Sequence, residues 1–269
     1  FCGMKLLENK NQLLMPVGIN FHGLEMFQKA PTLKYKIQQV FLKKPVLKSM
    51  QNADVVFSLG GKLTEIIAKH GISKEKIVQI PIGIDESWLN TMALKIHSPR
   101  KFIFIGRYER RKGIEELTKT IKQLLPKHRF SIDFIGAIPE YKKIKSSAVF
   151  YYGSITEVKK IKQLLSQADV LICPSFSEGM PTVILEAMAS GLAVIATDVG
   201  AVSEQVTEKN GKLITPVNIN ELKQAIIEFI NMPEDELLKM KQYSMERISD
   251  NFTWDKIIIK TIESIKQLN

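Results

Sequence analysis

Short apolar runs alternate along the chain with longer segments in which apolar residues recur at a helical period. The runs predict buried strands and the longer segments predict amphipathic helices, as in 112–125, where Ile114, Leu117, Ile121 and Leu124 form one stripe. Strands are expected over 16–21, 53–58, 77–80, 101–106, 130–135, 148–152, 169–173, 192–196 and 212–214, and helices over 33–51, 62–70, 112–125, 218–231, 234–249 and 253–268. This alternation predicts an α/β fold built on parallel sheets.

Turn-forming residues divide these elements into two series. The segment 81–85 interrupts the first series, and a linker over 86–100 leads to the second. Three strands with two helices are too few for a complete doubly wound domain, whereas the second series is long enough for a Rossmann-like domain. We therefore expect an incomplete first domain over 1–90, a second domain over 91–251 and a final helix over 252–269. Because the chain begins with Phe1, we expect it to lack roughly a hundred N-terminal residues of an ordinary two-domain protein.

The composition is that of an ordinary soluble globular protein, with 45% apolar and 25% charged residues. No run of eighteen or more apolar residues predicts a membrane span. Cys2 and Cys173 provide no disulfide framework, so a reducing cytoplasmic location is expected.

The net charge of +10 is concentrated at the start of the chain, where residues 1–50 hold eight lysines against Glu8 and Glu25. Such a basic surface could contact a nucleic acid, an anionic membrane or only solvent. Nucleic acid ranks last as a partner because aromatic residues are sparse among the lysines and no nucleic-acid-binding motif is present. The segment 35–48 suits either peripheral contact with an anionic membrane or an apolar stripe turned to the core.

Several common site motifs are absent from the sequence. No Gly-x-Gly-x-x-Gly follows a predicted strand, no Gly-x-x-x-x-Gly-Lys-Ser/Thr loop occurs, and the cysteines and histidines have no zinc-ligand spacing. A nicotinamide-dependent dehydrogenase, a P-loop NTPase and a zinc site are therefore disfavoured. No organic cofactor is expected.

Two polar loops that follow predicted strands carry the residues best suited to bind a ligand. The loop after 169–173 holds Glu178, and the helix behind it holds Glu186. The turn Gly106-Arg107-Tyr108-Glu109-Arg110-Arg111-Lys112-Gly113 places two cations, Arg107 and Lys112, before another helix. Carboxylates suit sugar hydroxyls, while cations and free helix-start amides suit a diphosphate. Both loops are expected at the carboxyl ends of parallel strands, where open α/β sheets bind ligands.

These motifs resemble the signature of the family four glycosyltransferases, which are retaining enzymes of the GT-B fold. The resemblance rests on Glu178 and Glu186 with the Ala-Met-Ala-Ser-Gly that follows, on the turn over 106–113, on the His-Gly pair at His22 and on the Pro-Ile-Gly-Ile-Asp segment over 81–85. It implies two Rossmann-like domains facing each other across a cleft, the first incomplete here, with a last helix that crosses back to the first. The implied reaction moves a sugar from a nucleotide-sugar, with a UDP-sugar as the expected donor, to a glycan, lipid or other acceptor, with retention and without a metal.

The resemblance also assigns roles to individual residues. His22, Arg107, Lys112 and Glu178 become the candidate catalytic residues: Glu178 would contact the donor sugar, and His22 would lie against it from the first domain. Arg107 and Lys112 would hold the diphosphate, and Glu186 would bind the ribose hydroxyls. Further donor contacts, mostly through the backbone, are implied for Gly106, Gly179, Met180, Thr182 and Val183. Pro181, which lies between Met180 and Thr182, has no N–H to donate to a phosphate.

Four other residues carry expectations of their own. Arg110 and Arg111 fall between the motif positions and are expected to be solvated. Glu204, in the loop after the strand 192–196, is expected to be structural. Thr253 is expected to cap the last helix.

Three alternatives to glycosyl transfer stay open. One is a basic module that binds a nucleic acid or an anionic membrane with a steep salt dependence. A sugar-nucleotide epimerase on the same fold would use a similar donor site, and a non-catalytic subunit would bind the nucleotide-sugar without turnover. The pair Glu178 and Glu186, together with Gly106 and Arg107, favours transfer. The basic N-terminal segment would be compatible with a peripheral position at the inner face of a membrane.

Overall fold

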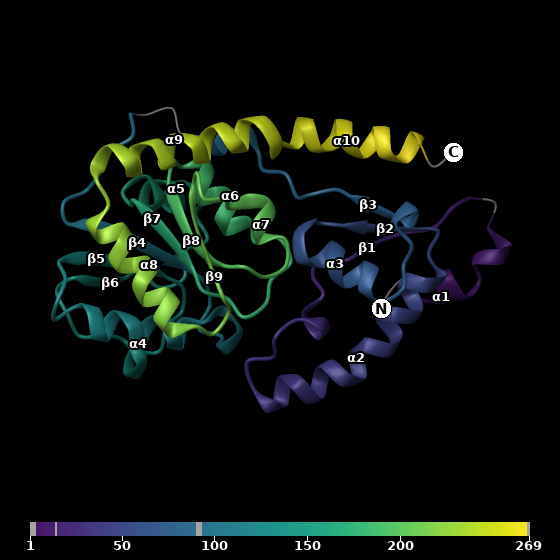
Figure 1. Cartoon of the computed structure of the whole chain (residues 1–269), viewed down its shortest axis with the longest axis horizontal. Coiled ribbons are helices and arrows are strands. Elements are labelled where there is room, and N and C mark those ends of the chain that lie inside the picture. The colour runs from purple at the N-terminus through teal and green to yellow at the C-terminus, as the bar shows by residue number, and fades with distance from the viewer. Residues whose placement is uncertain (1–3, 14, 90–92, 268–269) are drawn as a thin grey trace.

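A computed structural model describes residues 4–13, 15–89 and 93–267 and contains two sheets (Figure 1). The smaller sheet has the strand order β1-β2-β3, and the larger has the order β6-β5-β4-β7-β8-β9. Every pair of neighbouring strands is parallel, so the expected α/β architecture is confirmed. We call residues 4–89 the N-terminal unit and residues 93–251 the C-terminal unit.

The N-terminal unit alternates strands with helices as the apolar pattern predicts. Its elements are α1 (Met4–Glu8), β1 (Gly18–Asn20), α2 (Leu33–Asn52), β2 (Val55–Ser58), α3 (Gly61–Lys69) and β3 (Ile77–Gln79), with 3₁₀ turns at η1 (Lys10–Gln12), η2 (Glu25–Phe27), η3 (Lys74–Lys76) and η4 (Glu86–Trp88). The predicted strands and both predicted helices of this unit are confirmed, with ends displaced by a few residues.

The C-terminal unit holds the six strands expected there and ends in two long helices. Its strands are β4 (Arg100–Ile105), β5 (Phe130–Ile135), β6 (Val149–Tyr151), β7 (Val170–Cys173), β8 (Ala193–Thr197) and β9 (Gly211–Ile214). Its helices are α4 (Ile114–Leu124), α5 (Val158–Ser166), α6 (Thr182–Ala189), α7 (Val202–Gln205), α8 (Ile219–Asn231) and α9 (Glu234–Asn251), with 3₁₀ turns η5 (Arg110–Lys112) and η6 (Glu140–Lys142).

Side chains of the larger sheet alternate between two helical layers. Phe102 and Phe104 of β4 belong to the apolar cluster that contains α4 and α8, whereas Ile103 belongs to the cluster that contains α5, α6 and α9. The second cluster continues into the N-terminal unit, where it includes Val56 and Leu63. One continuous apolar core therefore joins the N-terminal unit to one face of the larger sheet.

The turn before α4 shows why this helix begins two residues later than expected. Gly113 has φ +68°, a left-handed conformation that favours glycine, and it separates η5 from α4. A Cβ atom at Gly113 would lie 1.9 Å from the carbonyl oxygen of Pro174. The glycine therefore lets the turn after β4 press against the loop after β7.

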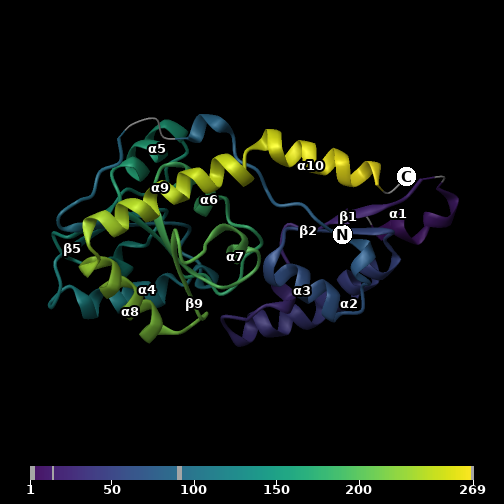
Figure 2. The same cartoon turned by 45° about the horizontal axis from the view of Figure 1, so that its top comes forward.

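Helix α10 (Trp254–Lys266) crosses from the C-terminal unit back over the N-terminal unit (Figures 1 and 2). Ile84 N donates to the Phe252 carbonyl at 2.7 Å, and Trp254 N donates to the Ile84 carbonyl at 3.1 Å. Thr253 occupies the position before the helix, but among the described residues its side chain makes no capping hydrogen bond, so the expected cap is wrong. Backbone pairing with Ile84 fixes the start of α10 instead.

A buried ion pair ties α9 to the larger sheet. Lys241 is 2% exposed and donates to Asp169 Oδ1 at 3.2 Å and to the carbonyls of Lys95 and Ala168. Asp169, which is fully buried, also accepts hydrogen bonds from the backbone of His97 and Lys101. Burial lowers the pKa of Lys241, and the neighbouring Asp169 charge opposes that shift.

We expect Lys241→Met to destabilise the chain by about 3–5 kcal/mol, because it leaves the Asp169 carboxylate buried without its cation. Urea unfolding followed by circular dichroism measures the change. Lys239→Met on the same helix is the matched control, since Lys239 and its partner Asp235 are 77% and 76% exposed. The control should change stability by less than about 0.5 kcal/mol, and equal losses in the two variants would contradict the assigned role of Lys241.

Candidate functional site

The two motif loops meet where the strand order of the larger sheet reverses. β4 and β7 are neighbours at the middle of the sheet, and the chain proceeds outward from β4 to β5 and from β7 to β8. The turn 106–113 follows β4, and the loop 174–181 follows β7. Both therefore emerge at the same edge of the sheet, as the sequence predicts, at the point where open α/β sheets form their binding crevices.

Glu178 is the centre of this junction. Its side chain is 7% exposed, and it accepts hydrogen bonds from Ser175 Oγ at 2.6 Å and from Lys112 Nζ at 2.7 Å. Arg111 Nη1 lies 3.2 Å from its other carboxylate oxygen. Two cations from the turn after β4 thus neutralise one carboxylate from the loop after β7.

The structure corrects the expectation that Arg110 and Arg111 are solvated. The Arg111 side chain is 20% exposed and donates to the Ser177 carbonyl at 2.8 Å as well as to Glu178. Arg110 forms a bidentate pair with Glu116 and lies 4.7 Å from the centre of the Phe176 ring. The close approach of the two loops partly buries both arginine side chains, which the spacing of the motif does not reveal.

The remaining basic residue of the turn points to solvent. The Arg107 side chain is 78% exposed, and its only ion pair among the described residues is with Glu109, at 3.0 Å. Lys112 is 19% exposed and is held by Glu178. The two predicted phosphate-binding cations therefore differ, because Lys112 is held in the site by Glu178 whereas Arg107 is mostly exposed.

Helix α6 presents its first turn to the same region. It begins at Thr182, so the amides of Thr182 and Val183 lie in its first turn and have no acceptor four residues earlier within the helix. Thr182 is exposed, and Glu186 lies on the same helical face four residues later. Glu186 is half-buried, and burial raises the pKa of its carboxyl group. The structure thus brings these predicted residues onto one face beside the Glu178 loop.

The N-terminal unit closes on this loop at Gly179. A Cβ atom at Gly179 would lie 1.7 Å from the carbonyl oxygen of His22. The His22 residue itself is exposed at the end of β1. Met180 is buried, and its Sδ accepts a hydrogen bond from Ile82 N at 3.2 Å. The residues of both units that the sequence assigns to one site therefore lie close together in the structure.

Gln28 is a site residue that the sequence analysis missed. Its Nε2 donates to the Glu178 carbonyl at 2.6 Å, and its Oε1 accepts from Glu178 N at 3.2 Å. Gln39 of α2 in turn donates to the Gln28 carbonyl at 3.0 Å. A single glutamine after a 3₁₀ turn has no motif around it, so only its position against a loop 150 residues away identifies it.

A second pair of contacts holds the units together beside Gln28. Glu204 Oε1 accepts a hydrogen bond from Gly61 N at 2.9 Å, at the start of α3, where a helix favours negative charge. Lys62 Nζ pairs with Asp198 Oδ2 at 2.6 Å. These contacts give Glu204 a structural partner across the interface between the units.

The chemistry of the junction is that of a site for an anionic, hydroxyl-rich ligand. Lys112 and Arg107 supply positive charge, α6 supplies helix-start amides, and Glu178 and Glu186 supply acceptors for hydroxyl groups.

Within the described residues no group of three or more His, Cys, Asp or Glu side chains is arranged to hold a metal ion. In the same part of the chain, no helix has the length and apolar character needed to cross a membrane.

Comparison with known proteins gives matches over most of the chain. The family described as "Glycosyl transferases group 1" matches residues 92–247. A teichuronic acid biosynthesis glycosyltransferase of Bacillus subtilis is 30% identical over 192 residues, which are 68% of this chain and 48% of that protein. The alpha-maltose-1-phosphate synthase of Mycolicibacterium smegmatis is 28% identical over 230 residues, which are 76% of this chain and 57% of that protein. The chain thus spans about half the length of these curated relatives.

Solved structures show the same fold. The sucrose-phosphate synthase of Thermosynechococcus elongatus matches with a TM-score of 0.79 at 22% identity, covering 99% of this chain and 71% of that one. The Anabaena protein HepE in complex with UDP matches with a TM-score of 0.73 at 17% identity, covering 98% of this chain and 76% of that one. The expected GT-B fold is confirmed by these likenesses.

We expect Gln28→Ala to loosen the loop 174–181, because the Glu178 peptide loses a donor and an acceptor in a part-buried position. The loss should be about 1–3 kcal/mol, measured by urea unfolding, with faster hydrogen exchange at the Glu178 amide. Gln38→Ala, at an exposed position of α2, is the matched control and should leave both readouts near their wild-type values. Unchanged exchange at Glu178 in Gln28→Ala would contradict the assigned role.

Proposed function

The chain belongs to the glycosyl transferases of group 1, and we propose that it carries the donor site of an enzyme that transfers a sugar from a nucleotide-sugar to an acceptor. The observation that carries this proposal is the meeting of Lys112 with Glu178, at 2.7 Å, where the strand order reverses. That junction places a cation for a diphosphate beside a carboxylate for sugar hydroxyls.

In the proposed complex the donor lies across both motif loops. Lys112 and the exposed Arg107 bind the diphosphate together with the amides of Thr182 and Val183. Glu178, with the backbone of Gly179 and Met180, then contacts the transferred sugar. The half-buried Glu186 accepts hydrogen bonds from the ribose hydroxyls, and the exposed His22 faces the sugar from the N-terminal unit.

We propose a UDP-sugar as the donor. The support comes from solved structures of the same fold, since HepE is titled in complex with UDP and, in a further structure, with UDP-glucose. No organic cofactor enters this reaction. The cations of the turn after β4 neutralise the diphosphate in the place that a metal ion takes elsewhere.

The proposed reaction retains the anomeric configuration. The bond from the anomeric carbon to the diphosphate oxygen breaks, and its electron pair leaves with the UDP. The acceptor hydroxyl oxygen bonds to the same face of the anomeric carbon, and its proton passes to the departing phosphate oxygen. Lys112 and Arg107 stabilise the charge that develops on that oxygen.

We propose a glycan or a lipid-linked glycan as the acceptor, bound on the side of the N-terminal unit. One relative, 26% identical over 232 residues, is named as a transferase acting on a diphospho-undecaprenol. Others are named for the biosynthesis of teichuronic acid and colanic acid. These names support the acceptor class for this chain.

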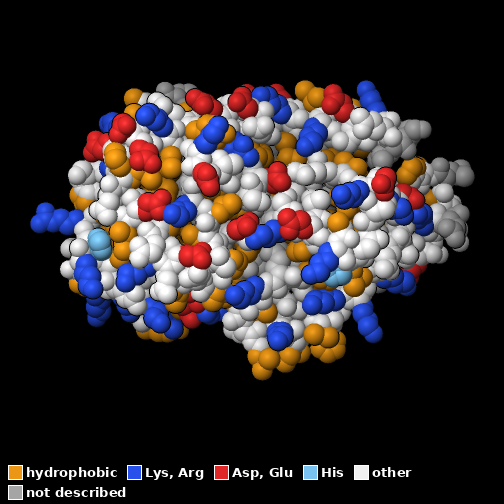
Figure 3. Space-filling model, in the orientation of Figure 1, with side chains coloured by type: hydrophobic (Ala, Val, Ile, Leu, Met, Phe, Trp, Pro, Cys, Tyr) orange, Lys and Arg blue, Asp and Glu red, His pale blue; other side chains and the backbone are white. Residues whose placement is uncertain are grey.

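We also propose that α2 contacts an anionic membrane surface. Its first half exposes Leu33, Ile37, Val40 and Phe41, which are between 53% and 75% exposed, whereas Val46 and Met50 of its second half are buried. Six lysines and no acidic residue lie between Glu25 and Asp54. Figure 3 shows hydrophobic side chains at the edge of the molecule where α2 runs, with Lys and Arg side chains around them. Exposed apolar side chains ringed by lysines suit an anionic interface.

We expect UDP to bind the chain in calorimetric titration, and Arg107→Ala and Lys112→Ala each to weaken it about tenfold or more, because each loses a charge-assisted hydrogen bond. Glu186→Ala should weaken it about three- to tenfold through the lost ribose contacts. Lys209→Ala, exposed in the turn before β9, is the control and should bind UDP as the wild type does.

The titration tests the donor site, and an assay of UDP release tests whether that site transfers a sugar. Absence of UDP binding by a folded wild-type chain would contradict the donor site. Binding with no release of UDP from UDP-sugars and acceptors, in a chain extended to the length of its relatives, would indicate a non-catalytic subunit.

We expect the chain to bind phosphatidylglycerol vesicles in flotation and Phe41→Gln to reduce partitioning about tenfold, since burying an exposed Phe contributes about 1.5–3 kcal/mol. Phosphatidylcholine vesicles should bind it more weakly because the lysines gain nothing from a neutral surface. Phe150→Gln is the matched control, because Phe150 is also exposed, at 45%, but lies on β6. Equal partitioning of all three proteins would exclude α2 as the contact.

A further inference from the structure

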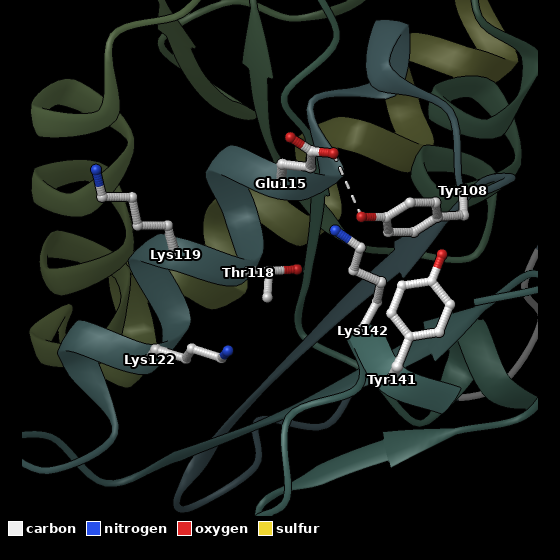
Figure 4. Close-up of a pocket in the computed structure, with 7 residues that line it drawn as sticks. All are labelled: Tyr108, Glu115, Thr118, Lys119, Lys122, Tyr141 and Lys142. Carbon is white, nitrogen blue, oxygen red and sulfur yellow. Dashed lines mark hydrogen bonds between the residues drawn. The ribbon is translucent and has the colours of Figure 1, made fainter. Parts of the chain in front are cut away.

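A cavity of about 440 Å³ lies on the C-terminal unit between α4 and the turn that follows β5 (Figure 4). Its volume is within the range of small-ligand sites, about 300–1,000 Å³. One wall is the outward face of α4, where Glu115, Thr118, Lys119 and Lys122 line the cavity. Their spacing places all four on one side of the helix.

The opposite wall is aromatic. Tyr108, from the turn after β4, and Tyr141, from η6, line it together with Lys142. Tyr141 is 83% exposed, and Lys142 Nζ lies 5.7 Å from the centre of its ring and 5.9 Å from that of Tyr108. Tyr108 Oη donates to Glu115 at 3.4 Å and so joins the two walls (Figure 4). A large ring this exposed adds little to the core, so its face is available to a ligand.

The cavity has a surplus of positive charge. Its single carboxylate, Glu115, already pairs with Arg110 at 3.4 Å. In the part of the chain that the structure describes, Lys119, Lys122 and Lys142 form no ion pair with any Asp or Glu side chain. Three ammonium groups thus line a cavity whose one carboxylate, Glu115, is shared between Arg110 and Lys142. A ligand that carries an acidic group would balance the excess positive charge.

We propose that this cavity binds an acidic sugar of a glycan chain, bearing either a carboxylate or a phosphate group. The ring of the sugar packs on Tyr141 or Tyr108, which have large amphipathic faces. Lys122 and Lys142 bind the acidic group. The Thr118 hydroxyl, which donates to the Ile114 carbonyl at 2.7 Å, accepts a hydrogen bond from a sugar hydroxyl. Two tyrosines favour a ring with an acidic substituent over a bare anion.

The position of the cavity connects it to the proposed donor site. Tyr108 directly follows Arg107 in the turn after β4. A glycan held in the cavity is thus kept beside the donor turn without occupying it. The choice of a glycan as the source of the acidic sugar rests on the proposed function, whereas the aromatic and basic walls do not.

An NMR titration of the full chain with hexagalacturonate tests the proposal, with maltohexaose as the neutral probe and inorganic phosphate as the bare anion. We expect hexagalacturonate to bind, and Tyr141→Ala and Lys122→Ala each to weaken it about three- to tenfold through the lost ring or ionic contact. Lys127→Ala, exposed just beyond α4, is the charge-matched control and should bind as the wild type does. UDP is titrated alongside, and its affinity should be unchanged in all three variants.

Each other outcome overturns a defined part of the proposal. Equal binding of maltohexaose excludes the acidic sugar, and equal binding of phosphate, weakened by the same variants, excludes the glycan. Hexagalacturonate binding that no pocket variant weakens excludes the cavity as the site. If the wild-type chain binds hexagalacturonate but not UDP, the donor site is overturned and the cavity proposal stands.

Discussion

The approach of the N-terminal unit to Gly179 is the constraint on which the site depends. With the His22 carbonyl 1.7 Å from where a Cβ would stand, only a residue without a side chain permits this contact. Gly200, on the other side, would place a Cβ 2.3 Å from the Glu178 and Gly179 carbonyl oxygens. The loop after β7 is therefore held between two backbones. The side-chain amide of Gln28 also bonds to both the N–H and the carbonyl of Glu178 in this loop. This holds Glu178 in place by packing as well as by charge.

The electrostatics of the site follow from that placement. A carboxylate as buried as Glu178 needs compensation, and Ser175, Lys112 and Arg111 provide it. Of these cations Lys112 is also suited to a diphosphate, so a bound nucleotide-sugar would share it with Glu178. Arg107, which pairs with Glu109 beside Arg111, adds positive charge at the exposed edge of this network. The site is thus neutralised internally and remains attractive to an anion at its rim.

The charge of +10 is divided among surfaces with different neighbours. Around the turn after β4, cations pair with Glu109, Glu116 and Glu178, whereas along α2 lysines surround exposed apolar side chains. In the cavity between α4 and η6, lysines surround tyrosines instead. These three surfaces suit chemically different ligands. Paired cations beside a carboxylate suit a nucleotide-sugar, lysines around aliphatic side chains suit an anionic membrane, and lysines around aromatic rings suit an acidic sugar.

The sequence by itself determined the strands, most helices and the two motif loops. The period at which apolar residues recur and the positions of turn-forming residues are local properties of the chain. It also indicated that Glu178 and Lys112 lie at one edge of a sheet. Only the tertiary structure decided that they form an ion pair, that Arg111 is drawn in with them and that Gln28 holds the loop. These contacts join segments 66 to 150 residues apart, so they depend on how the units pack, which no local pattern specifies.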